Sequence, residues 1–243
     1  MIERQRRVSA IVLICMIIAA GTIFQGLRQR EPKTENTIRQ VAGVATTNPD
    51  GTPATPASEA LKRLAIKGRA PKTGYKRTQF GDGWQTVGGC DVRNHVLKRD
   101  MQNTVTKSDT DCTVVSGVLY DPYTSKTIDF KRGTDTSDDV QIDHVVALSD
   151  AWQKGAQQLA PDQRQAFAND MLNLLAVDGP TNQKKGDGDA ATWLPPNKAY
   201  RCRYVARQIA VKIKYTLWLT QSEHDAISNV LDSCPSQQLP IVS

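Results

Sequence analysis

The sequence predicts an α+β domain with few strands, preceded by a segment of different composition. Two runs of β-branched and apolar residues, Thr113–Tyr120 and Thr127–Phe130, flank a turn at Asp121–Ser125 and predict a β-hairpin. Longer stretches with apolar residues at helical spacing follow towards the C-terminus. Of the 243 residues, 39% are hydrophobic, which is enough for a folded core and excludes a fully disordered chain.

Residues 1–30 have the composition of an export signal. Five arginines against one glutamate place +4 of the net charge of +6 in this segment, and Val8–Phe24 contains no charged residue. A basic flank before an apolar run is what the export machinery recognises. Small residues at Ala19–Gly21 would allow cleavage, whereas the uncharged run is at the short end for a membrane anchor. Two outcomes stay open: secretion, or anchoring to the outer face of the cytoplasmic membrane through residues 8–24.

Residues 31–58 are rich in Thr, Ala, Pro and Asn and lack a periodic apolar face. Such a composition buries too little apolar surface to offset the entropy lost on ordering, so we interpret this stretch as a disordered linker. The folded domain is accordingly expected to begin near Glu59 and to comprise residues 59–243.

The domain contains helical and strand-like patterns in an irregular order. Helices are expected at Leu61–Ile66, Val92–Met101, Ser149–Leu159, Asp162–Met171, Arg201–Leu219 and Gln221–Leu231. A break at Asp178–Pro180 is expected to open a further short helix that runs through Lys185. Besides the hairpin, strands are expected at Val140–Val146 and Leu174–Val177. The glycine-rich stretch from Gly68 to Gly89 is expected to form loops.

Four of the five cysteines lie in the domain: Cys90, Cys112, Cys202 and Cys234. An even number in an exported domain predicts disulfide bonds, and four cysteines permit three pairings. We favour the sequence-local pairing, Cys90–Cys112 with Cys202–Cys234, because each bond then closes a loop long enough to stabilise the fold. Zinc binding is the alternative, but no CxxC or HxxxH spacing favours it.

Side chains suited to acid–base and metal chemistry concentrate between Gln141 and Lys185. Asp143 and His144 end a predicted strand. A carboxylate is a hard oxygen ligand for a divalent cation, and a neutral imidazole can take a proton from water. Because neighbouring strand residues point to opposite faces, the two can serve one substrate only at a strand end or an irregularity. Asn182 could complete a metal site through its amide oxygen.

Four runs of sequence carry a family resemblance: IDHVVALSDAW, FANDMLNLLAVDGPTNQKKGD, TWLPP and RCRYVARQIAVKIKYTL. They are similar to the HNH nuclease superfamily and, more narrowly, to exported bacterial HNH proteins related to the C-terminal domain of the GmrSD restriction enzymes. The similarity extends upstream through GWQTVGGCDVRNHVLKRDM and DPYTSKTIDF, so it covers nearly the whole domain.

The resemblance implies a ββα-metal (HNH) core, in which two short strands and a helix hold one divalent cation. Additional helices and a β-hairpin elaborate this core, and disulfides stabilise it. The resemblance further implies that His144 is the general base and that Asp143 and Asn182 are the metal ligands. It implies that Asn173 holds the loop that orients the histidine and that Lys185 stabilises the phosphate. The implied ion is Mg²⁺, with Mn²⁺ as the alternative.

Basic residues gather downstream of this pattern. Eight Lys and Arg residues between Lys184 and Lys214 are accompanied by only two aspartates, which gives +6 over this stretch. Arg203, Arg207 and Lys214 fall near one face of the predicted long helix. With Lys184, they are expected to contact a phosphate backbone without reading bases. An ordinary solvated helix face is the alternative.

Together with the resemblance, these residues predict a metal-dependent endonuclease that hydrolyses DNA with low sequence specificity, with RNA as a second candidate substrate. The alternative is a non-catalytic exported module that binds nucleic acid or the cell envelope on the same fold. The presence of all five residues of the pattern favours catalysis. His95 and His224 lie outside the pattern and are expected to be packing or surface residues. We expect a monomer that contacts the membrane only through its N-terminal segment.

Overall fold

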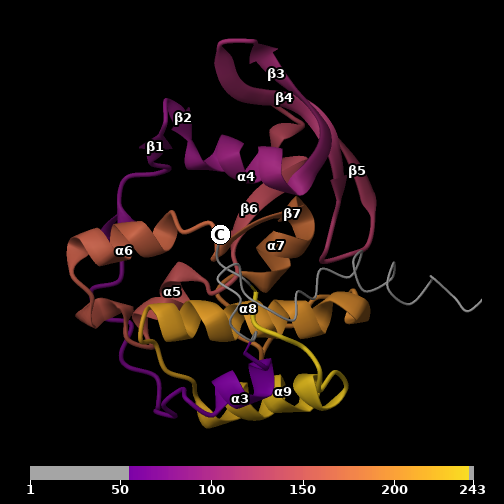
Figure 1. Cartoon of the computed structure of the whole chain (residues 1–243). Helices are drawn as coiled ribbons and strands as arrows, with labels where there is room; N and C mark the ends of the chain where they lie inside the picture. The colour runs from indigo at the N-terminus through magenta and orange to yellow at the C-terminus, as the bar shows by residue number, and fades with distance from the viewer. Residues whose placement is uncertain (1–54, 241–243) are drawn as a thin grey trace, which may run out of the picture. The chain divides into compact units, whose positions relative to one another are not determined.

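The structure, a computed structural model, describes residues 55–240 and confirms an α+β fold (Figure 1). In this part of the chain the α-helices are α3 (Ala57–Leu61), α4 (Val92–Asp100), α5 (Leu148–Trp152), α6 (Pro161–Ala168), α7 (Gly179–Lys185), α8 (Arg201–Lys214) and α9 (Gln221–Asp232). The strands are β1 (Thr86–Val87), β2 (Cys90–Asp91), β3 (Met101–Ser108), β4 (Asp111–Tyr120), β5 (Thr127–Lys131), β6 (Val140–His144) and β7 (Leu174–Asp178). They form three antiparallel sheets, β1–β2, β3–β4–β5 and β6–β7.

The predicted export segment, residues 1–30, and the predicted linker up to residue 54 lie outside the described residues. Within residues 55–240, no helix is both long enough and apolar enough to cross a membrane. Residues 55–58, which we expected at the end of the linker, belong to the fold instead. Ala57 is fully buried and its main-chain N–H donates to the oxygen of Gln237 at 2.8 Å.

Helix α4 packs between the three-stranded sheet and the β6–β7 pair (Figure 1). The side chain of Asp91 caps its first turn by accepting a hydrogen bond from the Asn94 N–H at 2.7 Å. This helix and the hairpin strands β4 and β5 confirm the predictions for that region. Strand β3 was not expected, because its sequence MQNTVTKS lacks an alternation of apolar and polar residues. In the structure most of its side chains are exposed. Pairing with β4 is what holds it in the sheet.

Strands β6 and β7 pair antiparallel, and α7 continues directly from β7. The register places His144, the last residue of β6, opposite Leu174. Asp178 caps the first turn of α7 with its side chain. Gly179 is required at the junction, because a Cβ there would lie 1.9 Å from the main-chain oxygen of Asp138. The expected arrangement of two strands and a helix is therefore present.

Helices α3, α8 and α9 pack together on the other side of the core, against residues that follow β6 and belong to β7. Helix α8 ends at Lys214 rather than at Leu219, because Thr216 adopts a positive φ of 54° and the chain turns. Helix α3 precedes the helix expected at Leu61–Ile66, and Ile66 is 45% exposed. After Leu61 the chain forms a turn, which still buries Leu61 and Leu64 in the core.

The helices expected between β6 and β7 are shorter than predicted. The one expected at Ser149–Leu159 is divided into α5 and a 3₁₀ turn at Ala156–Gln158, because Gly155 between them has a φ of 121°. The one expected at Asp162–Met171 is α6, which has Pro161 in its first turn as predicted. It ends at Ala168, and the side-chain amide of the next residue, Asn169, donates to the oxygen of Gln165 at 3.0 Å.

Both predicted disulfide bonds are present, which excludes zinc binding by these cysteines. Cys90–Cys112 joins β2 to β4 across 22 residues, and Cys202–Cys234 joins α8 to the segment just after α9 across 32 residues. Loops of this length lose substantial entropy in the unfolded chain when they are closed, so both bonds stabilise the folded domain.

A buried cluster of six charged side chains, here called the ionic network, joins the helices to the loop after α7. Its members are Arg69, Asp150, Lys154, Asp189, Lys212 and Glu223. The ammonium of Lys154 lies 2.7 Å from Asp150, 2.7 Å from Asp189 and 2.6 Å from Glu223. Three cations balance three anions, and all except Arg69 are at most 3% exposed. Such charges are tolerated in a protein interior only when they are paired in this way.

The pKa of Asp189 predicts how this network responds to acid. Burial alone would raise that pKa, but the hydrogen bond and charge of Lys154, helped by Arg69, lower it from its ordinary 3.8. The ionised form therefore stabilises the folded state above pH 3.8, and this contribution is lost as the pH falls through the lowered pKa. We expect Asp189→Asn to lower the free energy of unfolding at pH 7, with a difference from wild type that shrinks in acid. Urea titrations from neutral to strongly acidic pH measure this difference, and a constant value would contradict the assignment.

Candidate active site

A cleft of about 440 Å³ lies where β6 ends and α7 begins. Three predicted site residues, Asp143, His144 and Asn182, line it together. The other residues that line it come from β6, the loop after β6, the start of α5, the residues after α7, α4 and the segment before α4: Gln141, Ile142, Ala147, Leu148, Ser149, Gly186, Asp187, Arg93, Tyr75, Arg77 and Trp84. Because His144 is the last residue of β6, the alternation of a regular strand does not separate it from Asp143.

His144 is buried and held in one orientation. Its Nε2 lies 2.8 Å from the main-chain oxygen of Ala168, and its ring stacks on Trp84 with centroids 5.8 Å apart and planes 12° from parallel. Because a carbonyl oxygen can only accept, Nε2 carries the proton and Nδ1 is left as an acceptor. Burial lowers the pKa of His144 to about 3, against the effect of the Ala168 hydrogen bond, and the charges of Arg77 and Lys185 act in the same direction as burial. The imidazole is thus neutral at physiological pH.

Asn173 is fully buried and pins the loop that follows His144. Its Oδ1 accepts from the N–H of Val146 at 2.8 Å, and its Nδ2 donates to the oxygen of Val146 at 3.2 Å. The N–H of Val145 donates to the main-chain oxygen of Asn173 at 2.8 Å. These are the contacts that a residue needs in order to fix the exit of β6.

Asp143 is buried between two donors. The Lys185 ammonium donates to its Oδ1 at 2.8 Å and to the main-chain oxygen of His144 at the same distance. The hydroxyl of Tyr123, which follows β4 in the turn at Asp121–Ser125, donates to its Oδ2. Burial raises the pKa of Asp143, although Lys185 and Tyr123 oppose that effect. Burial and the neighbouring Asp143 charge raise the pKa of Tyr123 well above its ordinary value, so the phenol stays protonated.

The position of Lys185 differs from what the sequence led us to expect. Its side chain is fully buried and ion-paired with Asp143, and it does not line the His144 cleft. An amino group in that position cannot contact a phosphate in the cleft without leaving its partner. Tyr123 was missed at the sequence level, because nothing in a turn sequence indicates a contact with a strand that follows it by 20 residues.

Asp143 and Asn182 offer oxygen ligands, the type that a hard divalent cation prefers. Within residues 55–240, no group of three or more His, Cys, Asp or Glu side chains is arranged to hold a metal ion. Asp143 and Asn182 nevertheless line the same cleft, and Asn182 uses its Nδ2 to donate to Gln141 at 3.0 Å, which leaves its Oδ1 as an acceptor. Each carboxylate oxygen of Asp143 accepts one hydrogen bond and retains a lone pair. Two such protein ligands, completed by water, are a usual set for Mg²⁺.

Of the three basic residues expected to form one phosphate-binding face on α8, Arg207 and Lys214 contact other parts of the protein, and Arg203 is exposed. Arg207 donates to the main-chain oxygens of Met171, Leu172 and Leu174 at 2.6 to 3.0 Å, around Asn173. Lys214 is paired with Asp170 at 2.7 Å. Arg203 is exposed and lies over the ring of Tyr200, with its guanidinium carbon 5.3 Å from the ring centroid. Lys184 belongs to α7 and lies in a different cleft.

Fold and site together define an α+β domain whose cleft is built on the strand–strand–helix unit β6–β7–α7. Residues 91–230 match the family described as GmrSD restriction endonucleases, C-terminal domain, and the chain belongs to this family. The resemblance to the GmrSD C-terminal domain is thereby confirmed. Membership indicates a nuclease-like function that acts on nucleic acid.

A relative from the fungus Arthroderma benhamiae is named "Uncharacterized secreted protein". It is 38% identical to this chain over 205 residues, which cover 81% of this chain and 96% of the relative. The expectation of a specifically bacterial group is not supported, since this relative is fungal.

Proposed function

We propose that this protein is a divalent-metal-dependent HNH endonuclease that hydrolyses DNA with low sequence specificity. Family membership supports a nuclease, and one feature of the site supports the mechanism. This feature is the buried His144, whose Nε2 is committed to a main-chain oxygen and whose Nδ1 is free to accept a proton. It lines one cleft together with the oxygen ligands Asp143 and Asn182.

In this proposal, His144 is the general base. A water held against Nδ1 gives up its proton to the neutral imidazole as it attacks the phosphorus, and the hydrogen bond from Nε2–H to Ala168 steadies the ring while it becomes charged. Trp84 and the Asn173–Val146 contacts keep the ring in place. A divalent cation, Mg²⁺ or alternatively Mn²⁺, held by Asp143 and Asn182 would neutralise charge on the phosphate and the leaving oxygen.

Lys185 and Tyr123 are assigned a positioning role in place of the expected phosphate contact. Their two hydrogen bonds fix both carboxylate oxygens of Asp143, and Lys185 also ties the main chain of His144 to the same point. Positioning of this kind matters because a ligand or base misplaced by about 1 Å can reduce the rate by as much as ~10²-fold. Arg207 supports the site by holding the main chain on both sides of Asn173.

We further propose that the protein is secreted. The two disulfide bonds fit an oxidising compartment, and the fungal relative carries the word secreted in its name. The basic and apolar composition of residues 1–30 agrees with export. Anchoring through residues 8–24 has no support beyond that composition.

The test uses the full chain, purified with its disulfides formed, and plasmid DNA. We expect nicking and linearisation in the presence of Mg²⁺ or Mn²⁺ and none after dialysis against EDTA, with activity restored when the ion is added back. An RNA of comparable length, assayed in parallel, measures the sugar preference. Cleavage that persists undiminished in EDTA would rule out the metal-dependent mechanism.

A further inference from the structure

A second cleft, of about 490 Å³, adjoins the cleft that contains His144. Asp187 lines both, so the two clefts are neighbours on the surface and are together called the depression here. Four basic residues line the second cleft: Arg69, Lys72, Lys184 and Lys185. Arg69 and Lys185 are ion-paired with buried carboxylates, which leaves Lys72 and Lys184 as the exposed cations without a buried partner. The half-buried ring of Trp193 contributes an apolar wall. Trp193 is itself packed against Tyr123, with ring centroids 5.0 Å apart, so this wall is firmly supported.

Positive charge along this depression is available to a ligand. Arg77 in the first cleft and Lys184 in the second are exposed, and neither is ion-paired to an acidic side chain within residues 55–240. Lys72 lies 3.2 Å from Asp187, but both side chains are more than half exposed. A pair of this kind contributes about 0–1 kcal/mol, so a phosphate can compete for Lys72.

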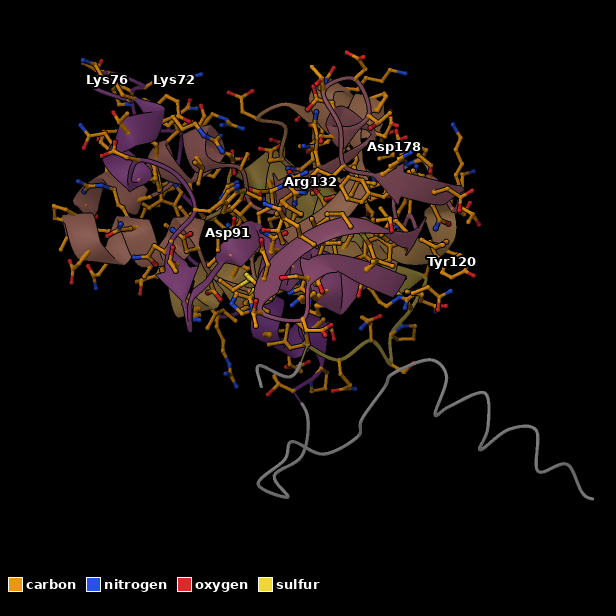
Figure 2. All side chains as sticks on the ribbon, turned by 90° about the horizontal axis from the view of Figure 1, so that it is seen from above. Lys72, Lys76, Asp91, Tyr120, Arg132 and Asp178 are labelled. Carbon is orange, nitrogen blue, oxygen red and sulfur yellow. A yellow bond between two sulfur atoms is a disulfide. The ribbon has the colours of Figure 1, made fainter. Side chains whose placement is uncertain are left out.

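Most of this charge comes from a segment outside the family match. Residues 69–84 precede the matched range of 91–230, yet they supply Lys72 to the second cleft and Arg77 and Trp84 to the first. Figure 2 shows Lys72 and Lys76 near the same outer edge in that view. Trp152 fixes this segment by donating its indole N–H to the oxygen of Thr73 at 3.2 Å.

We propose that Lys72, Arg77 and Lys184 form a basic track that holds the phosphate backbone of double-stranded DNA on both sides of the scissile bond. This proposal rests on the proposed nuclease function and specifies where its substrate lies. A backbone in the first cleft passes His144, and its continuation lies in the second cleft between Lys72 and Lys184. The α8 face is the alternative surface. Its Arg207 and Lys214 are already bonded within the protein, so only Arg203 is left exposed there without an ion pair among residues 55–240.

The test measures DNA binding without turnover, in a His144→Ala background. A fluorescently labelled 20-base-pair duplex is titrated with the protein at several salt concentrations, and anisotropy gives the dissociation constant. The test variant is Arg77→Ala with Lys184→Ala, and the matched variant removes two cations from α8, Arg203→Ala with Lys214→Ala. The thermal unfolding midpoint of each variant checks that it is folded.

We expect the Arg77/Lys184 variant to bind about tenfold more weakly and to lose roughly two units of the salt-dependence slope, since each phosphate contact contributes about 0.9. The α8 variant is expected to bind as the background does. Loss of slope only in the α8 variant, or equally in both, would overturn the track. If the wild-type protein does not cleave DNA but binds it through Arg77 and Lys184, the basic track stands and the proposed nuclease function is wrong. If the wild type cleaves DNA but the Arg77/Lys184 variant binds it unchanged, the nuclease function stands and the basic track is wrong.

Discussion

His144→Ala is expected to reduce the rate of DNA cleavage by about 10²- to 10⁴-fold, the usual effect of removing a general base. The imidazole is the one neutral base among the side chains that line the cleft, and its Nε2–H is already committed to Ala168. Alanine leaves no group that can accept the proton of the attacking water. Initial rates on plasmid DNA at saturating Mg²⁺ measure the loss, and the affinity for DNA should change much less than the rate.

The matched control is His224→Ala. His224 lies on α9, is partly exposed and has its Nδ1 3.3 Å from Asp225, and it does not line the cleft. This variant should cleave at the wild-type rate, which separates loss of the base from loss of any histidine. Equal rates for the His144 variant and the wild type would show that another group activates the water.

The strand–strand–helix unit could be predicted from the sequence because its parts are local. The strands expected at Val140–Val146 and Leu174–Val177 are short stretches rich in apolar residues, and Gly179–Pro180 marks the start of the helix that follows. The pairing of these elements could be inferred only from the family resemblance, since 29 residues lie between the two strands. The disulfide pairing could also be predicted from the sequence, because the sequence-local choice among the three possible pairings is the one that forms.

The contacts that surround the site could not be predicted in the same way. From the sequence alone, Lys185 is expected to be a surface residue of a short helix. Its contact with Asp143 depends on how α7 packs against β6. Tyr123 and Trp84 reach the site from segments 20 and 60 residues before Asp143 and His144, and no local periodicity encodes such distances. Their positions depend on how separate elements pack, which a pattern of apolar residues leaves open.

The basic face of α8 shows a different difficulty. Helical spacing correctly places Arg203, Arg207 and Lys214 on one helix, but it gives no information about what their long side chains reach. Arg207 extends to the main-chain oxygens of Met171 and Leu172, which precede β7 and have no strand partner, and to that of Leu174 at the start of β7. The charge therefore stabilises the loop that contains Asn173. Net charge along a helix is a poor guide to ligand binding where main-chain oxygens lie within reach.

The largest effect on stability is expected from Glu223→Gln in the ionic network. Glu223 is fully buried and lies 2.6 Å from Lys154 and 3.0 Å from Lys212. The amide keeps the shape of the side chain but removes one of three negative charges, so two fully buried ammonium groups lose a partner. Breaking a buried pair in this way typically costs about 3–5 kcal/mol. Urea unfolding followed by tryptophan fluorescence at pH 7, with the disulfides intact, measures the loss.

Two further variants distinguish the network from a simple packing effect. Glu59→Gln disrupts a surface pair with Lys62, in which the side chains are 58% and 69% exposed, and should change the free energy of unfolding by less than about 1 kcal/mol. Adding Lys212→Met to Glu223→Gln removes one cation along with the anion and restores the balance of charge, so the double variant should be more stable than Glu223→Gln alone. If the second substitution destabilises the protein further, by the full cost of each change, then the six charges are not coupled. Arg69 and Asp189 would in that case be joined to α8 and α9 by packing alone.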